Sequence, residues 1–332
     1  MAKIKVALIG AGGWGRNHAR AYAQNPNTEL CCIVGRTLER TRMRAEEFHV
    51  PFYLDVDEML EKEKPDFVGI CLPGMDTYDT TMKIIRAGIP LLVEKPLAYE
   101  LEDAKNMIRE AESKNLFFGI DFNQRFSIPS ELAYQAVTEG KIGEINYIMW
   151  KFCHGWAGKM KHPYTNIIEA QCHGLNYMEA FCGPIDSIMA EMTDKTGIGG
   201  YSTFALAVRF QSGAVGSMMA SFDAADQYPL AQEIEINGSK GRIRIEDNAQ
   251  KYSCQTRESP LAETWGAGFF MDQERVFSYN TDRVIGKTIS AFLEGKQPPV
   301  PAREGLRALE LAYCAIESFE KGVRVKVPAE IV

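Results

Sequence analysis

The feature that most constrains this sequence is a glycine-rich turn near its N-terminus. Residues Ile4–Ile9 form a continuous apolar run, which predicts a strand buried on both faces. The sequence Gly10-Ala11-Gly12-Gly13-Trp14-Gly15 follows, and residues 16–24 are predicted to be helical. G-x-G-x-x-G between a strand and a helix is typical of a dinucleotide site, although a turn without a ligand is the alternative. The expected cofactor-binding residues here are Gly10, Gly12, Gly13, Trp14 and Gly15.

The three glycines of this pattern have different physical roles. The first permits a tight turn, the second lets a pyrophosphate approach the backbone, and the third lets the helix pack close to the strand. The helix then directs its N-terminal amides toward the phosphates.

Strands and helices continue to alternate over the next hundred residues. Helices are predicted over residues 38–48, 76–87 and 101–114, and strands over 30–34, 66–71, 90–93 and 116–121. Such alternation indicates right-handed βαβ units and an α/β fold with a doubly wound parallel sheet.

The end of the second strand bears on cofactor choice. NAD sites usually have an acidic residue there, but this chain has Gly35 followed by Arg36 and Thr37. A guanidinium suits a phosphate and can stack on adenine, so we predict that Arg36 and Thr37 favour NADP over NAD. The alternative is that Arg36 only begins a solvated helix. Leu72 and Pro73, which follow the strand at 66–71, are expected to border the nicotinamide, although a plain loop would look the same.

A lysine stands at the carboxyl end of the next strand, in Val93-Glu94-Lys95-Pro96. Open parallel sheets bind ligands outside the carboxyl ends of their strands. A lysine there can donate a proton or polarise a hydroxyl group if its pKa is tuned. Glu94 and Lys95 are therefore candidate site residues, and a surface lysine that caps a strand is the alternative.

Composition limits the partners and the compartment. The chain has 332 residues, which favours two domains, and a net charge of -7, which argues against nucleic acid or an anionic membrane as a partner. It has no long apolar span and no signal-peptide pattern. Its eight cysteines include no C-x-x-C pair, so reduced thiols and a cytoplasmic location are expected.

Further motifs follow in order along the chain. They are Gly-Arg-Asn-His after the first turn, Glu94-Lys95-Pro96, Asn123-Gln124-Arg125-Phe126, residues 140–144, His173, residues 238–241 and residues 305–310. Their order and spacing resemble those of the glucose–fructose oxidoreductase / inositol dehydrogenase / MocA family over essentially the whole chain.

This resemblance implies a Rossmann domain over residues 1–121 and a substrate-binding and oligomerisation α/β domain over 122–332. The second domain would have a large, open, mostly antiparallel sheet, and the last helix, about 303–322, would dock back on the first domain. Strands are predicted from the residues themselves over 144–152, 186–194, 203–210, 214–222, 232–237 and 242–246. Family members bind NAD(H) or NADP(H), act on sugars or cyclitols, and use the open sheet face to form dimers or tetramers.

Residues 167–178 contain a candidate catalytic group. In a regular helix Glu169, His173 and Asn176 would share one face. A carboxylate one turn before a histidine can fix its tautomer and raise its basicity, and a solvent-facing polar stripe is the alternative. The family has aspartate at the first position and often an acidic residue at the third. Glu169 and Asn176 replace them, and Asn176 can bind a hydroxyl group without carrying a proton.

Two further residues are candidates for substrate binding. Trp156 lies in a polar and aromatic loop over residues 153–164 and can stack on a sugar ring, although an ordinary surface loop is an equal alternative. Arg125 matches a basic residue beside the family's active site, with a structural ion pair as the alternative. Cysteines and histidines between residues 153 and 173 lack zinc-site spacing, so no metal is expected.

The predicted reaction is hydride transfer between nicotinamide C4 and a secondary-alcohol carbon of a sugar, cyclitol or related polyol. His173, oriented by Glu169, would take the hydroxyl proton, and the Lys95 ammonium would stabilise the alkoxide, although these two residues can exchange roles. One alternative is a lyase or glycosidase that uses tightly bound NAD(P). The other is a cofactor-dependent, sugar-sensing regulatory protein without turnover.

Overall fold

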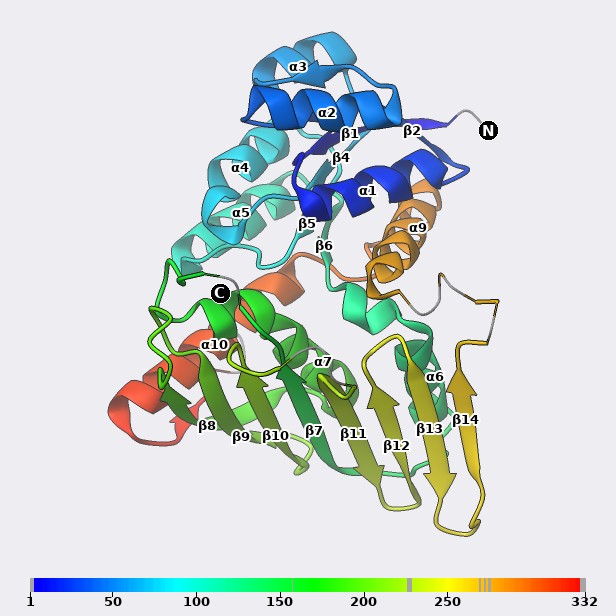
Figure 1. Ribbon diagram of the computed structural model, residues 1–332, viewed down its shortest axis with the longest axis vertical. Coiled ribbons are helices and arrows are strands. Elements are labelled where there is room, and N and C mark those ends of the chain that lie inside the picture. Colours follow the sequence, from blue (N-terminus) through cyan, green and yellow to red (C-terminus); the bar gives the residue numbers. More distant parts are fainter. Residues whose placement is uncertain are drawn as a thin grey trace. The chain divides into compact units, whose positions relative to one another are not determined.

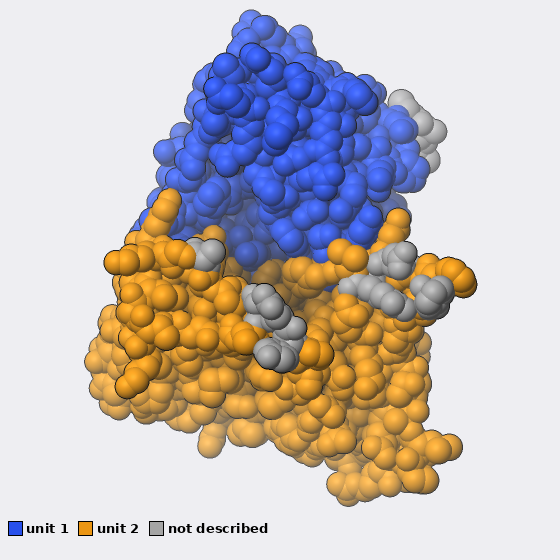
Figure 2. Space-filling view, in the orientation of Figure 1, with its two compact units in different colours: residues 1–123, 278–306 blue, residues 124–277, 307–332 orange. Residues whose placement is uncertain are grey.

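The computed structural model describes residues 3–156, 158–225, 229–268, 270–271, 273 and 276–328. The chain forms two compact units, coloured blue and orange in Figure 2. Unit 1 consists of Met1–Asn123 and Ser278–Leu306, and unit 2 of Gln124–Phe277 and Arg307–Val332. The predicted boundary after residue 121 lies close to the end of the first segment, whereas residues 278–306 return to unit 1. The division into domains over 1–121 and 122–332 stays a prediction.

Unit 1 contains a parallel sheet of six strands in the order β3-β2-β1-β4-β5-β6 (Figure 1). The strands are β1 (Ile4–Ile9), β2 (Thr28–Val34), β3 (Phe52–Tyr53), β4 (Phe67–Ile70), β5 (Leu91–Glu94) and β6 (Phe118–Asp121). The strand order reverses between β1 and β4, where a doubly wound sheet opens a crevice at its carboxyl edge.

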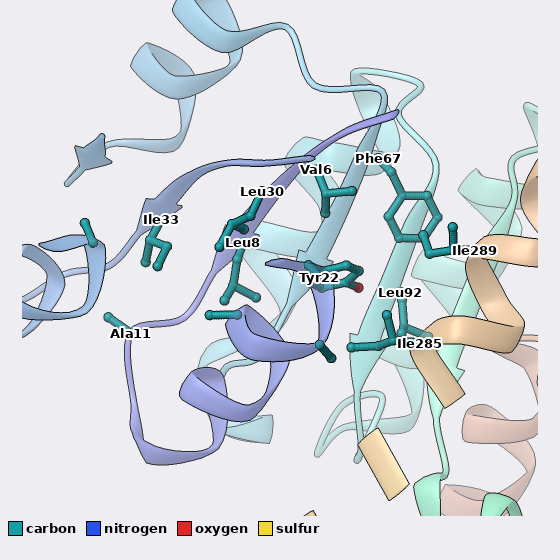
Figure 3. Close-up of a cluster of buried hydrophobic side chains, with 13 residues drawn as sticks. Val6, Leu8, Ala11, Tyr22, Leu30, Ile33, Phe67, Leu92, Ile285 and Ile289 are labelled. Atoms are coloured by element: carbon teal, nitrogen blue, oxygen red, sulfur yellow. The ribbon is translucent and has the colours of Figure 1, made fainter. Parts of the chain in front are cut away.

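Helices of unit 1 pack against this sheet and bury its apolar side chains. They are α1 (Gly13–Gln24), α2 (Leu38–Phe48), α3 (Val56–Glu63), α4 (Tyr78–Arg86), α5 (Leu101–Ser113) and α9 (Asn280–Leu293). Figure 3 shows Leu8 of β1, Tyr22 of α1 and Ile285 of α9 within one buried cluster. Arg20 of α1 also bonds Asp282 of α9, with Nε and Oδ1 3.3 Å apart. The late helix α9 is therefore an integral part of the unit 1 core.

Unit 2 contains a nine-stranded sheet in the order β14-β13-β12-β11-β7-β10-β9-β8-β15. Its strands are β7 (Ile145–Cys153), β8 (Ile185–Thr193), β9 (Thr203–Phe210), β10 (Val215–Ser221), β11 (Gln232–Gly238), β12 (Gly241–Glu246), β13 (Lys251–Thr256), β14 (Ala262–Gly266) and β15 (Val325–Lys326). β7 and β10 pair in parallel, and the other described pairs are antiparallel. The two sheets confirm the predicted fold class.

Helices α6 (Ile128–Thr138), α7 (Cys172–Cys182) and α10 (Arg303–Lys321) are the longer helices along unit 2. Gly174 of α7 lies so close to the sheet that an added Cβ would be 2.6 Å from the Trp150 ring. On α10, Ser318 Oγ accepts a hydrogen bond from the Ala190 N–H of β8. The opposite face of the sheet exposes the apolar side chains of Tyr147, Val215 and Met219. Among the described residues, no helix combines the length and apolar character that crossing a membrane requires.

Candidate functional site

A pocket of about 580 Å³ opens at the carboxyl ends of β1, β2 and β4 in unit 1. Its lining brings together six of the predicted cofactor-binding residues: Gly10, Gly12, Arg36, Thr37, Leu72 and Pro73. It also includes Arg40, Asp76 and Tyr78, which the sequence did not indicate. The pocket lies where the strand order reverses, which is the ligand-binding position of this fold class.

The glycines of the first turn divide into two kinds. Gly10 has a φ of +134°, and a Cβ at Gly10 would overlap the carbonyl oxygen of Cys71. A Cβ at Gly15 would overlap the carbonyl oxygen of Gly10. At Gly12 and Gly13, by contrast, a Cβ would meet no atom within 4 Å. Packing within the protein therefore requires glycine at Gly10 and Gly15, whereas Gly12 and Gly13 leave open space beside the backbone.

That open space lies at the N-terminus of α1. The N-cap residue, Gly12, provides no side-chain hydrogen bond to the first turn. The first amides of a helix have no partners within the helix, and its N-terminus carries a partial positive charge. The backbone around Gly12 and Gly13 is thus suited to a pyrophosphate, so the residues present fit a dinucleotide.

Arg36 lies at the rim of the same pocket. Its Nη1 is 2.9 Å from Oδ2 of Asp76, which belongs to the short helix η1 (Gly74–Asp76) after β4. The Arg36 side chain is 70% exposed and that of Asp76 40%. Because exposed ion pairs contribute little stability, this guanidinium can exchange its carboxylate partner for a phosphate at small cost.

Glu94 ends β5, Lys95 follows it, and the Lys95–Pro96 peptide bond is cis. Glu94 is buried and accepts hydrogen bonds from Trp14 Nε1 at 2.6 Å and from the Lys95 backbone N–H at 3.0 Å. His18 Nε2 lies 3.0 Å from Oε1 of the same carboxylate. The indole N–H of Trp14, which we predicted to be a cofactor-binding residue, therefore contacts Glu94.

A second buried carboxylate, Asp121, lies beside Glu94. The two residues are register partners on β5 and β6. Burial and the negative charge of Glu94 raise the pKa of Asp121 well above its usual range. Burial also raises the pKa of the Cys71 thiol, with smaller contributions from Glu94 and Asp121. Sequence reasoning missed His18 and Asp121 as members of this cluster. The aspartate at the end of the apolar run 116–121 was a usable signal for a buried carboxyl group.

In unit 2 the predicted single helix over 167–178 is wrong. Residues Asn166–Ala170 form a π-helical turn that contains Glu169, and α7 begins only at Cys172. The Gln171 N–H bonds the Asn166 carbonyl, five residues back. This wider turn departs from the regular helix on which the predicted spacing of Glu169, His173 and Asn176 was based.

Those two predicted residues of α7 are buried. His173 and Asn176 are each 6% exposed and lie one turn apart. Asn176 Oδ1 accepts a long hydrogen bond, 3.4 Å, from Nη1 of Arg125, which belongs to the short helix η2 (Asn123–Phe126). The structure thus brings together two predicted substrate-binding residues, Arg125 and Asn176.

Trp156 occupies a separate position after β7. Its ring stacks on Phe222 with centroids 4.6 Å apart and an interplanar angle of 19°. The side chain is still exposed, as are Lys159 and Lys161 of the same loop. Ala157, also in that predicted loop, lies outside the described residues.

Comparison with known proteins gives matches to both parts of the chain. The family described as "Oxidoreductase family, NAD-binding Rossmann fold" matches residues 4–122, and the "GFO/IDH/MocA C-terminal domain" matches residues 131–244. Myo-inositol 2-dehydrogenase of Thermotoga maritima is 24% identical over 336 residues, which cover 98% of each chain. D-glucoside 3-dehydrogenase of Escherichia coli K12 is 31% identical over 144 residues, 43% of this chain and 41% of that protein.

A solved structure shares the fold along nearly the whole chain. Levoglucosan dehydrogenase in complex with NADH and L-sorbose superposes with a TM-score of 0.88 and 20% identity, covering 99% of this chain and 100% of that one. Together with the two family matches, this places both units within one known architecture. The chain belongs to the glucose–fructose oxidoreductase / inositol dehydrogenase / MocA family of oxidoreductases, whose N-terminal part is an NAD-binding Rossmann fold.

Proposed function

We propose that this chain is an NAD(P)-dependent dehydrogenase or reductase of a sugar, cyclitol or related polyol. The observation that carries the proposal is the open backbone at Gly12 and Gly13, which form the N-terminus of α1, next to a pocket that Gly12 lines at the carboxyl edge of the sheet. The names of the relatives, an inositol dehydrogenase and a glucoside dehydrogenase, support a polyhydroxylated substrate. In this proposal the N-terminal domain binds the cofactor and the C-terminal domain binds the substrate.

Bound nicotinamide supplies the hydride-transfer chemistry. The Lys95 ammonium stabilises the developing alkoxide, and His173 accepts the hydroxyl proton. We propose that Glu169 supports His173 from the π-helical turn, and that Arg125, Trp156 and Asn176 contact the substrate. A buried amide such as Asn176 both donates and accepts hydrogen bonds, which suits a sugar hydroxyl group.

We also propose that NADP is preferred over NAD. Arg36 and Thr37 follow β2, where an acidic residue would otherwise bind the ribose 2′-hydroxyl. A phosphate on that hydroxyl would compete with Asp76 for the Arg36 guanidinium.

The outer face of the unit 2 sheet is the proposed interface of a homodimer or homotetramer. Tyr147 of β7 and Val215 and Met219 of β10 expose apolar surface there, which is typical of an interface. The double variant Val215→Glu, Met219→Glu should reduce the mass measured by light scattering. An unchanged mass would contradict this interface.

A substrate screen that follows reduced-cofactor absorbance tests the activity. With an active substrate, Lys95→Met and His173→Ala should each lower kcat by about 10²–10⁴-fold, since each removes a proton-transfer or charge-stabilising group. Near-normal turnover in either variant would contradict its assignment. Cofactor that stays bound without net turnover during sugar cleavage would instead indicate a redox-assisted lyase or glycosidase. Sugar-dependent cofactor binding with no reaction would indicate a regulatory protein.

A further inference from the structure

Three ionisable side chains form a buried cluster next to the backbone of Lys95. His18 comes from α1, Glu94 from β5 and Asp121 from β6, and all three are at most 5% exposed. Because Glu94 and Asp121 are register partners on adjacent strands, their side chains leave the sheet on the same face. His18 Nε2 lies 3.0 Å from Glu94 Oε1 and 3.4 Å from Asp121 Oδ2. One imidazole therefore faces both carboxyl groups.

The hydrogen bonds indicate that Glu94 is the ionised member. Oε1 accepts from Trp14 Nε1, and Oε2 accepts from the Lys95 backbone N–H. With His18 the carboxylate has three N–H neighbours, and such donors favour the charged form of a buried carboxylate.

Asp121 is the neutral member. Burial raises its pKa most, the charge of Glu94 raises it further, and the Lys95 ammonium and the Asn123 N–H oppose both effects only in part. A second carboxylate ion in the same buried cluster as Glu94 would carry a large electrostatic cost, as in other pairs of close carboxyl groups.

The imidazole is then neutral as well. His18 Nδ1 is buried and has no hydrogen-bond partner among the residues that the structure describes. An imidazolium would bury an N–H without an acceptor, whereas a neutral ring protonated on Nε2 donates to Glu94 and leaves Nδ1 unprotonated. The cluster consequently holds one negative charge, on Glu94.

We propose that His18 and Asp121 are positioning residues that hold the Glu94 carboxylate against the backbone N–H of Lys95 and thereby fix where the Lys95 side chain begins. The role assigned to Lys95 rests on the proposed function. His18 supplies a hydrogen bond that anchors Glu94. Asp121, kept neutral, fills the space next to Glu94 without adding a charge that would draw the imidazole away.

A metal site is the competing use of these atoms. Donor atoms of His18, Cys71 and Glu94 lie within 4.8 Å of one another. However, both Glu94 oxygens already accept N–H donors, and burial raises the pKa of the Cys71 thiol, which disfavours the thiolate that a metal would bind. Stoichiometric metal in the purified protein, lost in His18→Gln, would overturn the proposal.

Amide hydrogen exchange of Lys95, followed by NMR, tests the anchoring directly and needs no substrate. His18→Phe removes the N–H that donates to Glu94 while keeping a ring. The hydrogen bond from the Lys95 N–H to Glu94 should then lose its charge-assisted character, so amide exchange at Lys95 should accelerate about tenfold. His18→Gln retains an N–H near the position of Nε2 and should restore protection. The amide exchange of Val68 on β4, whose N–H bonds the Pro90 carbonyl just before β5, should be unchanged in both variants.

Two exchange results would overturn the proposal. One is unchanged protection of Lys95 in His18→Phe. The other is equal acceleration at Lys95 and Val68, which would indicate a general loss of stability rather than a local anchor.

Asp121→Asn supplies the matched test of the neutral acid. An amide resembles a protonated carboxyl group in shape and charge, so this variant should keep Lys95 protection. It should also lose one infrared band of a protonated carboxyl group that the wild type shows at neutral pH. Absence of that band from the wild type would overturn the assignment. If a substrate is found, His18→Phe should lower kcat while leaving cofactor affinity nearly unchanged, whereas failure of the substrate screen would refute only the proposed function.

Discussion

Arg36 Nη1 lies 2.9 Å from Asp76 Oδ2, so the residue expected to bind the 2′-phosphate of NADP is paired with a carboxylate of the same pocket. Arg36 follows β2, and Asp76 belongs to η1 after β4. An exposed pair of this kind is worth about 0–1 kcal/mol. The pair therefore reduces the affinity for a phosphate modestly rather than blocking it.

Asp76→Asn should tighten NADP binding by up to about fivefold and leave NAD binding nearly unchanged, because it removes the carboxylate that competes for Arg36. Dissociation constants measured by calorimetry for both cofactors provide the check. Asp79→Asn is the matched control, since Asp79 also lines the pocket and also changes by one charge. A similar tightening in both variants would indicate a general charge effect.

Arg36→Ala should weaken NADP binding by about tenfold or more, because a charge-assisted bond to the 2′-phosphate contributes about 1.5–3 kcal/mol. NAD, which lacks that phosphate, should bind nearly as before. The same calorimetric measurement compares the two cofactors. Wild-type protein that binds NAD as tightly as NADP would refute the proposed preference.

Gly12→Ala and Gly15→Ala should affect different properties, cofactor affinity and fold stability respectively, although both add one methyl group to the same turn. The Gly12 methyl group would meet no protein atom and would enter the space proposed for the pyrophosphate. We expect a loss of cofactor affinity of about tenfold or more with an unchanged melting temperature. The Gly15 methyl group would overlap the Gly10 carbonyl and should destabilise the fold by about 1–3 kcal/mol. Thermal unfolding without cofactor, and titration with it, separate the two results.

The features that sequence patterns predicted well are those set by neighbouring residues. The glycine turn, the end of β5 just before Lys95 and the alternating strand β11 (Gln232–Gly238) depend on local hydrophobic periodicity and backbone freedom. Each can be inferred from a short window because the physical cause lies within that window.

The features that were missed depend on contacts between distant segments. The π-helical turn at Asn166–Ala170 adjoins Gln171, whose side chain accepts a hydrogen bond from Trp150 of β7. Likewise, the cluster of His18 and Asp121 exists only because β5 and β6 pair in one particular register. The hydrophobic periodicity near residue 18 or residue 121 does not indicate that register.

The stability of the protein should depend on pH through Asp121. In the unfolded chain this aspartate ionises near its ordinary pKa of about 3.9, whereas in the folded protein burial keeps it protonated to a much higher pH. Its contribution to stability is therefore complete below about pH 4 and is lost as the pH rises toward the raised folded pKa. Asp121→Asn has no proton to lose, so the variant lacks this dependence.

Urea unfolding of the wild type and of Asp121→Asn at about pH 5, 6 and 7 measures this contribution. The stability of the variant relative to the wild type should increase with pH in that range by up to about 1.4 kcal/mol per pH unit, which is the free energy of one proton per unit. Comparing the two proteins cancels the titration of groups that do not contact Asp121. If the folded cluster bound no extra proton, Asp121 would be charged in both states and the difference would stay constant, which would contradict the single-charge description of the cluster. A proton on Asp121 and a proton on His18 give the same slope, and the infrared band of a protonated carboxyl group distinguishes them.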